Sequence, residues 1–246
     1  MGFFSNLFAP SEPLNPLEEL RKTTLPINGA NELLNIIKRI ENGEAYASWL
    51  VGGCYESGSI LTPKGGVSFP KNKAKALWWK IKSGEDGCAS SQYTLGRMYF
   101  FGDGETNNLV QRDYLKALKW WGKAAENGEF CSLGALGEIF YQGNGVPINY
   151  EKAFEWFSKS INHPTAKECG FYDAAQRIGE MYAAGRGVHQ DFIQAYKWMT
   201  IAGCDPNLHH EFPLRGKLTP SELEKANVLI KEWHNSVQEF RKSSKK

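Results

Sequence analysis

The feature that most constrains the fold of this chain is a motif that recurs four times at nearly constant spacing. Each copy contains a glycine in the same frame, and successive frame glycines are 44, 41 and 42 residues apart. A period of about 40 residues is typical of stacked helical hairpins rather than of propeller blades or strand repeats. The four frame glycines are Gly52, Gly96, Gly137 and Gly179.

The residues around each frame glycine predict a first helix with one apolar face. An aliphatic residue precedes the glycine, and an aromatic residue follows three positions later. These offsets fall within one arc of a helix with 3.6 residues per turn, so this arc is expected to face the core. The aliphatic residues are Val51, Leu95, Leu136 and Ile178, and the aromatic residues are Tyr55, Tyr99, Phe140 and Tyr182.

A second helix follows in every copy, and its start is marked by a polar residue four positions before an alanine. A short polar side chain accepts hydrogen bonds from the free N–H groups of a first helical turn. The predicted caps are Asn72, Asp113, Asn149 and Asp191. A tryptophan stands three residues after each alanine, and we expect this row to pack between neighbouring repeats. The row consists of Trp79, Trp120, Trp156 and Trp198.

These motifs resemble the SEL-one-like repeats, relatives of the tetratricopeptide repeats, with the pattern AxxxLGxxYxxGxGVxxDxxKAxxWxxKAAxxG. The third and fourth copies follow it closely, whereas the first two have enlarged hairpin loops at 57–72 and 105–112. The resemblance implies an all-α, right-handed superhelical solenoid of antiparallel helix pairs. It also implies an adaptor, regulator or inhibitor role.

The chain divides into four segments on this basis. Residues 1–30 form an N-terminal segment, and 31–43 resemble a degenerate leading half-repeat. Four repeats occupy 44–203, and 204–246 hold a loop, a C-terminal capping helix and a basic tail. Thr219, Pro220 and Glu222 predict a capping box with proline at the first helical position. An apolar stripe to cover the last repeat follows at Leu223, Ala226, Leu229 or Ile230, and Trp233.

Composition and motifs exclude several classes of function. The 29 Lys and Arg residues balance 27 Asp and Glu residues and cluster only at the C-terminal tail, which argues against nucleic-acid binding. No stretch approaches the roughly 18 apolar residues of a membrane span. His209, His210 and Glu211 lack a metal-binding spacing, and no Ser, His or Cys set predicts a nucleophile. We therefore expect no metal, no cofactor and no enzymatic activity.

Five cysteines without a paired spacing favour a reducing compartment. Secreted cysteine-rich members of the resembling family carry a disulfide in each repeat, and this chain lacks that pattern. The expected location is the cytoplasm.

The best candidate for a binding surface is the side of the first helices opposite the core arc. At about 100° per residue, positions three before, one after and four after the frame glycine lie on that side. An ordinary solvated face would not be expected to carry this many aromatic residues, and aromatic residues and arginine are favoured in binding hot spots. The alternative is that neighbouring first helices use these aromatics for packing between repeats. The predicted partner-binding residues, here called the outward row, are Trp49, Glu56, Tyr93, Arg97, Phe100, Glu138, Tyr141 and Glu180.

The predicted function is therefore non-enzymatic binding of a partner protein on the concave face of the solenoid. Short, unexported bacterial members of the family are similar to immunity proteins, which implies a toxin or secreted effector as partner. The alternative is a cytosolic signalling or assembly scaffold. An immunity protein forms one tight complex, whereas a scaffold tolerates several weaker partners.

Overall fold

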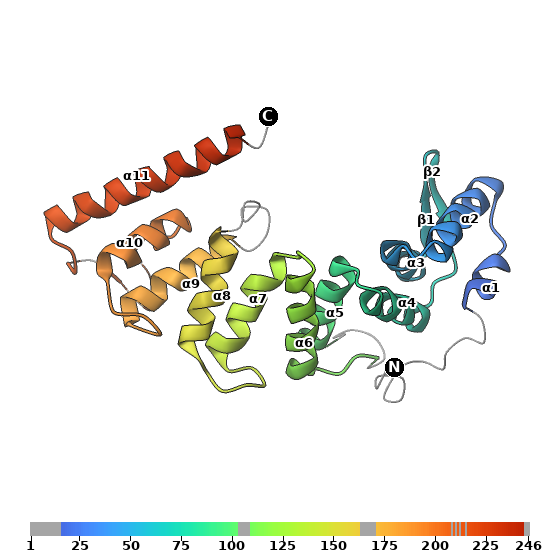
Figure 1. Cartoon of the computed structure of the whole chain (residues 1–246), viewed down its shortest axis with the longest axis horizontal. Helices are drawn as coiled ribbons and strands as arrows, with labels where there is room; N and C mark the ends of the chain where they lie inside the picture. The colour runs from blue at the N-terminus through green and yellow to red at the C-terminus, as the bar shows by residue number, and fades with distance from the viewer. Residues whose placement is uncertain are drawn as a thin grey trace. The chain divides into compact units, whose positions relative to one another are not determined.

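The computed structural model describes residues 16–102, 109–162, 171–207, 209, 211, 213–214 and 216–243. These residues are mostly helical and form successive helix pairs, as expected for an α/α repeat solenoid (Figure 1). Contacts divide the chain into two compact units, Met1–Gly128 and Glu129–Lys246. Each unit has its own buried apolar clusters.

The first unit holds two leading helices, a β-hairpin and two helix pairs. Within each pair the helices pack against each other, and α4 also packs on α5. The elements are α1 (Pro16–Arg21), α2 (Ile27–Glu41), α3 (Ala45–Ser57), β1 (Ser59–Thr62), β2 (Gly65–Ser68), α4 (Lys73–Glu85), α5 (Ala89–Phe101) and α6 (Tyr114–Glu126). The predicted leading helix at 31–41 is part of α2, which begins four residues earlier.

The enlarged loop of the first repeat contains a β-hairpin, although the sequence analysis expected no strand. Thr62 pairs with Gly65, so a two-residue turn joins the antiparallel strands β1 and β2. Ile60 is buried against α2, whereas Leu61 is 79% exposed. The strands are only four residues long and β2 begins with two glycines, so their alternation was too short to recognise.

The second unit holds two helix pairs followed by a terminal helix. Here α8 packs on both α7 and α9, while α10 packs on α9 and α11. The elements are α7 (Cys131–Gln142), α8 (Tyr150–Asn162), α9 (Phe171–Ala184), α10 (Phe192–Ile201) and α11 (Pro220–Ser243).

All four predicted caps accept a hydrogen bond from the first turn of the second helix. These caps are Asn72, Asp113, Asn149 and Asp191. The backbone N–H of each cap also donates to the carbonyl of an aromatic residue in the first helix of the same repeat. The carbonyls belong to Tyr55, Tyr99, Phe140 and Tyr182. One residue therefore starts the second helix and ties it to the first.

The frame glycines allow the second helix to approach closely. A Cβ atom added at Gly137 would lie 2.5 Å from the ring of Phe157, and one at Gly179 would lie 2.7 Å from Met199 Cγ. Real Cβ contacts are longer than this, so only glycine fits. The residue over the glycine, here called the facing residue, stands four positions after the alanine of the second helix. The four facing residues are Lys80, Trp121, Phe157 and Met199.

The tryptophan row, one position before the facing residues, is less uniform than predicted. Trp79 and Trp120 are buried, whereas Trp156 and Trp198 are partly buried. Trp120 packs over Gly84 of α4 and so does lie between neighbouring repeats. The facing residues are buried in all four repeats.

The C-terminal helix starts with the predicted capping box. The Thr219 N–H donates to Glu222 Oε2 at 2.8 Å, and the Glu222 N–H donates to Thr219 Oγ1 at 3.3 Å. The bonds from Thr219 lower the pKa of Glu222 below its ordinary value. Ile230 and Trp233 then pack against a cluster that contains Ile201, as expected for a capping helix.

The described cysteines are not all in the same state. Cys54 and Cys88 are buried free thiols, and burial raises the pKa of Cys54 to about 11, with a contribution from Glu32. Cys204 is also free, but Cys131 is disulfide-bonded. The cysteine spacing, from which no disulfide pattern was recognised, therefore did not predict the disulfide of Cys131.

Candidate partner-binding surface

In the first repeat the outward row presents an aromatic stack. The rings of Tyr46 and Trp49 lie 5.1 Å apart with an interplanar angle of 22°, and Tyr46 is 46% exposed. The Trp49 indole N–H is buried and has no hydrogen-bond partner among the residues that the structure describes. This stack is a large aromatic area at the start of α3.

Glu56 lies in the last turn of the same helix and forms an ion pair. Its carboxylate is exposed and accepts a hydrogen bond from Lys80 Nζ at 2.8 Å. Lys80 itself is only 5% exposed. A buried ammonium needs such a partner, because an unpaired buried charge is strongly unfavourable.

In the second repeat Tyr93 and Arg97 lie one turn apart on α5. Tyr93 is partly buried, and its carbonyl accepts a bond from Trp121 Nε1 at 3.2 Å. Arg97 is exposed. None of the described residues forms a hydrogen bond or an ion pair with its guanidinium. Arg97 is therefore available to a partner.

Phe100 packs within its own repeat. Its ring lies 5.2 Å from Tyr114 and 5.2 Å from Trp121 of α6, and it is partly buried. The alternative in the sequence analysis was that these aromatics pack between neighbouring repeats. Phe100 does pack, but against the second helix of its own repeat. Its use by a partner stays a prediction.

In the second unit an arginine bridges the two acidic residues of the row. Arg177 Nε donates to Glu138 at 2.6 Å, and Arg177 Nη1 donates to Glu180 at 2.9 Å. Burial alone would lower the pKa of Arg177, but the bonds and charges of the two carboxylates raise it above its ordinary value. The three side chains form a charged bridge between α7 and α9.

Glu180 lies deeper than the sequence analysis expected. It is 1% exposed, accepts a bond from Gln176 Nε2 at 2.9 Å and lies 3.3 Å from His209 Nε2. The expectation that Glu180 faces outward is wrong, because Gln176, Arg177 and His209 lie against its carboxylate. Its carboxylate interacts with side chains inside the protein.

Tyr141 is buried as well. It is 8% exposed, and its hydroxyl accepts a bond from Arg186 Nη1 at 2.9 Å. The Arg177 guanidinium lies 5.0 Å from the ring centroid, a cation–π distance. Burial raises the pKa of Tyr141, and the bond from Arg186 opposes this only in part. Its predicted outward exposure is therefore also wrong.

The sequence analysis missed Lys80, Arg177 and Arg186. Arg177 stands two positions before its frame glycine, where the other repeats have Leu50, Thr94 and Ala135. Because the charge occurs in one repeat only, the periodicity carried no signal for it.

The described residues contain no group of three or more His, Cys, Asp or Glu side chains placed to hold a metal ion. Within the same residues no helix combines the length and the apolar character needed to cross a bilayer. What the outward row offers is aromatic area, an exposed guanidinium and charged pairs. These groups suit noncovalent recognition.

The geometry of paired helices over frame glycines agrees with a known repeat. The family model described as Sel1 repeat matches residues 45–88, 89–129, 132–163 and 173–205, more than half of the chain. The chain belongs to the Sel1 repeat family. No curated protein matches it.

Three solved structures are similar to this chain. A Sel1 repeat protein from Oxalobacter formigenes is 26% identical, with a TM-score of 0.53 over 71% of this chain and 61% of that chain. A protective antigen of uropathogenic Escherichia coli strains with an SLR fold is 24% identical, with a TM-score of 0.44 over 85% of this chain and 49% of that chain. An immunity protein from Pseudomonas aeruginosa is 18% identical, with a TM-score of 0.37 over 90% of this chain and 83% of that chain. This chain spans less than two thirds of the first two proteins.

Proposed function

We propose that this Sel1 repeat protein is a protein-interaction module without chemistry of its own, and that it binds a partner protein through the outward row of its first unit. The observation that carries the proposal is the exposed Arg97 beside Tyr93, with the Tyr46–Trp49 stack in the preceding repeat. Arginine, tyrosine and tryptophan are the residues most often found in binding hot spots.

The second unit supports this choice of face by contrast. There the row residues Glu138, Tyr141 and Glu180 are bonded to Arg177 and Arg186. Partner contacts would first have to break these bonds. In the first unit Glu56 is likewise bonded to Lys80, but the side chains of Trp49, Tyr93 and Arg97 form no such bond with the described residues.

The family resemblance suggests a particular form of binding, the neutralisation of a toxin. We propose that the protein acts in the cytoplasm. A toxin-neutralising protein forms a tight one-to-one complex, which light scattering of the complex purified from the native cell would detect. Several weaker partners would favour the scaffold alternative.

The experiment on the face compares the double variant Tyr93→Ala, Arg97→Ala with Lys38→Ala, which removes an exposed cation from α2. We expect the double variant to weaken binding of the purified partner by about 2 kcal/mol or more, roughly thirtyfold, while Lys38→Ala changes little. Circular dichroism and the melting temperature should stay near those of the parent. Undiminished binding by a folded double variant would rule out this face, and unfolding would show that Tyr93 and Arg97 are packing residues.

A further inference from the structure

The β-hairpin of the first repeat directs part of its backbone outward. Phe69 donates its N–H to the Gly58 carbonyl at 2.9 Å, so these two residues form a hydrogen-bonded pair. Bonded and non-bonded pairs alternate along an antiparallel ladder, and the N–H and C=O groups of a non-bonded pair point to the outer edges. The non-bonded pairs of the hairpin are Leu61–Gly66 and Ser59–Ser68.

The two outer edges of the hairpin differ. β1 lies against α2 and α3 (Figure 1), and the Ser57 hydroxyl bonds to both the N–H and the C=O of Ser59. On β2, Gly66 and Ser68 are exposed, and outside the hairpin no described residue bonds to their backbone groups. An edge strand of this kind is a template for one more strand.

The outer face of the hairpin has a gap beside an exposed leucine. Ile60 and Val67 face α2, where Val67 lies over Gly29. Leu61 is on the opposite face, and its cross-strand neighbour on β2 is Gly66. A Cβ atom added at Gly66 would have no atom within 4 Å. A large side chain on an added strand can therefore lie over Gly66 and contact Leu61, as aromatic residues do over edge glycines.

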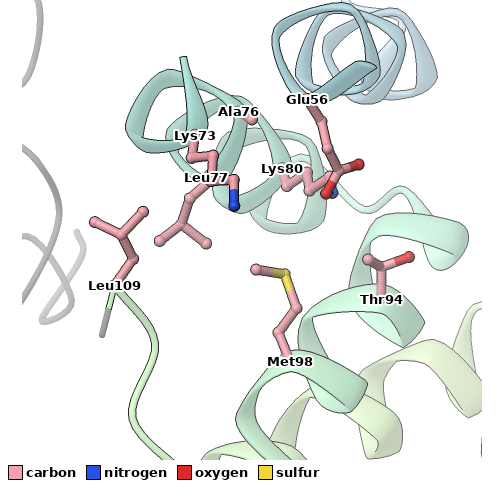
Figure 2. A pocket seen from close by; sticks show the side chains of 8 residues that line it. All are labelled: Glu56, Lys73, Ala76, Leu77, Lys80, Thr94, Met98 and Leu109. Atoms are coloured by element: carbon pink, nitrogen blue, oxygen red, sulfur yellow. The ribbon is translucent and has the colours of Figure 1, made fainter. Parts of the chain in front are cut away.

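Two lysines flank β2. Lys64 lies in the turn before the strand, and Lys71 lies three residues after it. Both are exposed, neither forms an ion pair with a described residue, and the loop 57–72 contains no Asp or Glu. In the pocket beside α4 and α5, by contrast, Lys80 is bonded to Glu56 (Figure 2). The cations at the two ends of β2 lack the partner that Lys80 has.

We propose that β2 binds an extended segment of a partner protein as a third, antiparallel strand. Gly66 and Ser68 supply the backbone N–H and C=O groups that strand addition uses. An aromatic residue of the segment lies over Gly66 against Leu61, and carboxylates near its two ends pair with Lys64 and Lys71. This edge is separate from the outward row, so the inference goes beyond the proposed function and does not depend on it.

Charge favours this occupant over a second copy of the chain. Two antiparallel β2 strands would bring Lys64 of one copy toward Lys71 of the other, and like charges on opposite strands are unfavourable. Pro70 has no N–H, so the open edge ends after Ser68. A short segment with acidic ends fits both the length of the edge and its flanking charges.

The test titrates the full chain with a fluorescently labelled heptapeptide of sequence EVTFTVE. In the proposed pairing the phenylalanine opposite Gly66 donates its own N–H to β2, whereas the N–H of the next threonine points away. We expect N-methylation of the phenylalanine to weaken binding at least tenfold, because a backbone donor is lost. N-methylation of that threonine, the matched control, should change binding less than threefold. The peptide KVTFTVK should bind at least tenfold more weakly than EVTFTVE.

Two variants of the chain locate the binding. Ser68→Pro removes an N–H that points outward, so the hairpin ladder keeps its bonds, and peptide binding should fall at least tenfold. Leu61→Thr keeps a residue that favours strands but removes the apolar contact, and binding should fall at least threefold. Leu115→Thr, a control at an exposed leucine of α6, should have little effect. Circular dichroism and the melting temperature establish that each variant is folded.

Several outcomes would overturn the proposal. These are no binding of EVTFTVE, equal effects of the two N-methyl groups, or undiminished binding by the folded Ser68→Pro and Leu61→Thr chains. A concentration-dependent dimer that Ser68→Pro dissociates would assign the edge to a second copy instead. The double variant Tyr93→Ala, Arg97→Ala should bind the peptide as the parent does, so failure of the outward row and failure of the β2 edge are distinguishable.

Discussion

A single side chain over each frame glycine determines how closely the two helices of a repeat pack. Phe157 is 1% exposed and lies against Gly137, whereas its neighbour Trp156 is partly buried and has the Lys159 ammonium 4.4 Å from its ring centroid. Sequence spacing alone favoured the tryptophan because it recurs in every repeat. Burial shows that the next position carries more of the packing.

We therefore expect Phe157→Ala to be the more damaging of two neighbouring truncations. It removes a buried ring and leaves a cavity beside Gly137, so it should lower the free energy of unfolding by about 3 to 5 kcal/mol. Trp156→Ala should cost about 1 to 2 kcal/mol, since its ring is only partly buried. Urea unfolding followed by circular dichroism gives both values. An equal or larger loss for Trp156→Ala would show that the tryptophan row, and not the row of facing residues, holds the main core position.

At the scale of helices, the starts were predictable and the interactions between distant segments were not. Asp191 caps α10 by accepting hydrogen bonds from the N–H groups two and three residues later, so a short stretch of sequence is enough to predict its role. Arg177 is bonded to Glu138, 39 residues earlier, and Glu180 lies against His209, 29 residues later. A helical wheel places Glu180 on an outer arc, but it cannot show that a residue far along the chain lies against that arc.

The caps themselves give a prediction for α10. Asp191 Oδ1 accepts from the N–H groups of Ile193 at 2.9 Å and Gln194 at 3.0 Å, and its own N–H ties α10 to α9. Asp191→Ala keeps the N–H but loses the acceptor, which should cost about 1 kcal/mol of unfolding free energy. Asp191→Asn retains an acceptor and should differ from the parent by only a few tenths of a kcal/mol. Equal losses in the two variants, measured by thermal unfolding, would assign the effect to charge rather than to capping.

Over the whole chain, the repeat period predicted the helical architecture because each repeat contains the same signals for helix starts and for the core-facing side. The hairpin β1–β2 escaped prediction since it occurs once and its strands are short. The candidate site was only half predictable for a related reason. Periodicity names the positions on a face, but burial of Tyr141 and exposure of Arg97 depend on groups that the period does not contain.

The distribution of buried side chains predicts how stability varies along each unit. In α11 the only buried side chain that the structure describes is Ala226, and in α1 it is Leu20, whereas α9 buries Ile178 and Met181 among others. Amides in helices with few buried contacts exchange through local opening of low free energy. We expect hydrogen exchange followed by mass spectrometry to show α11 exchanging at least tenfold faster than α9, and α1 at least tenfold faster than α5. Protection of α11 equal to that of α9 would mean that the terminal helix opens only together with the repeat it covers.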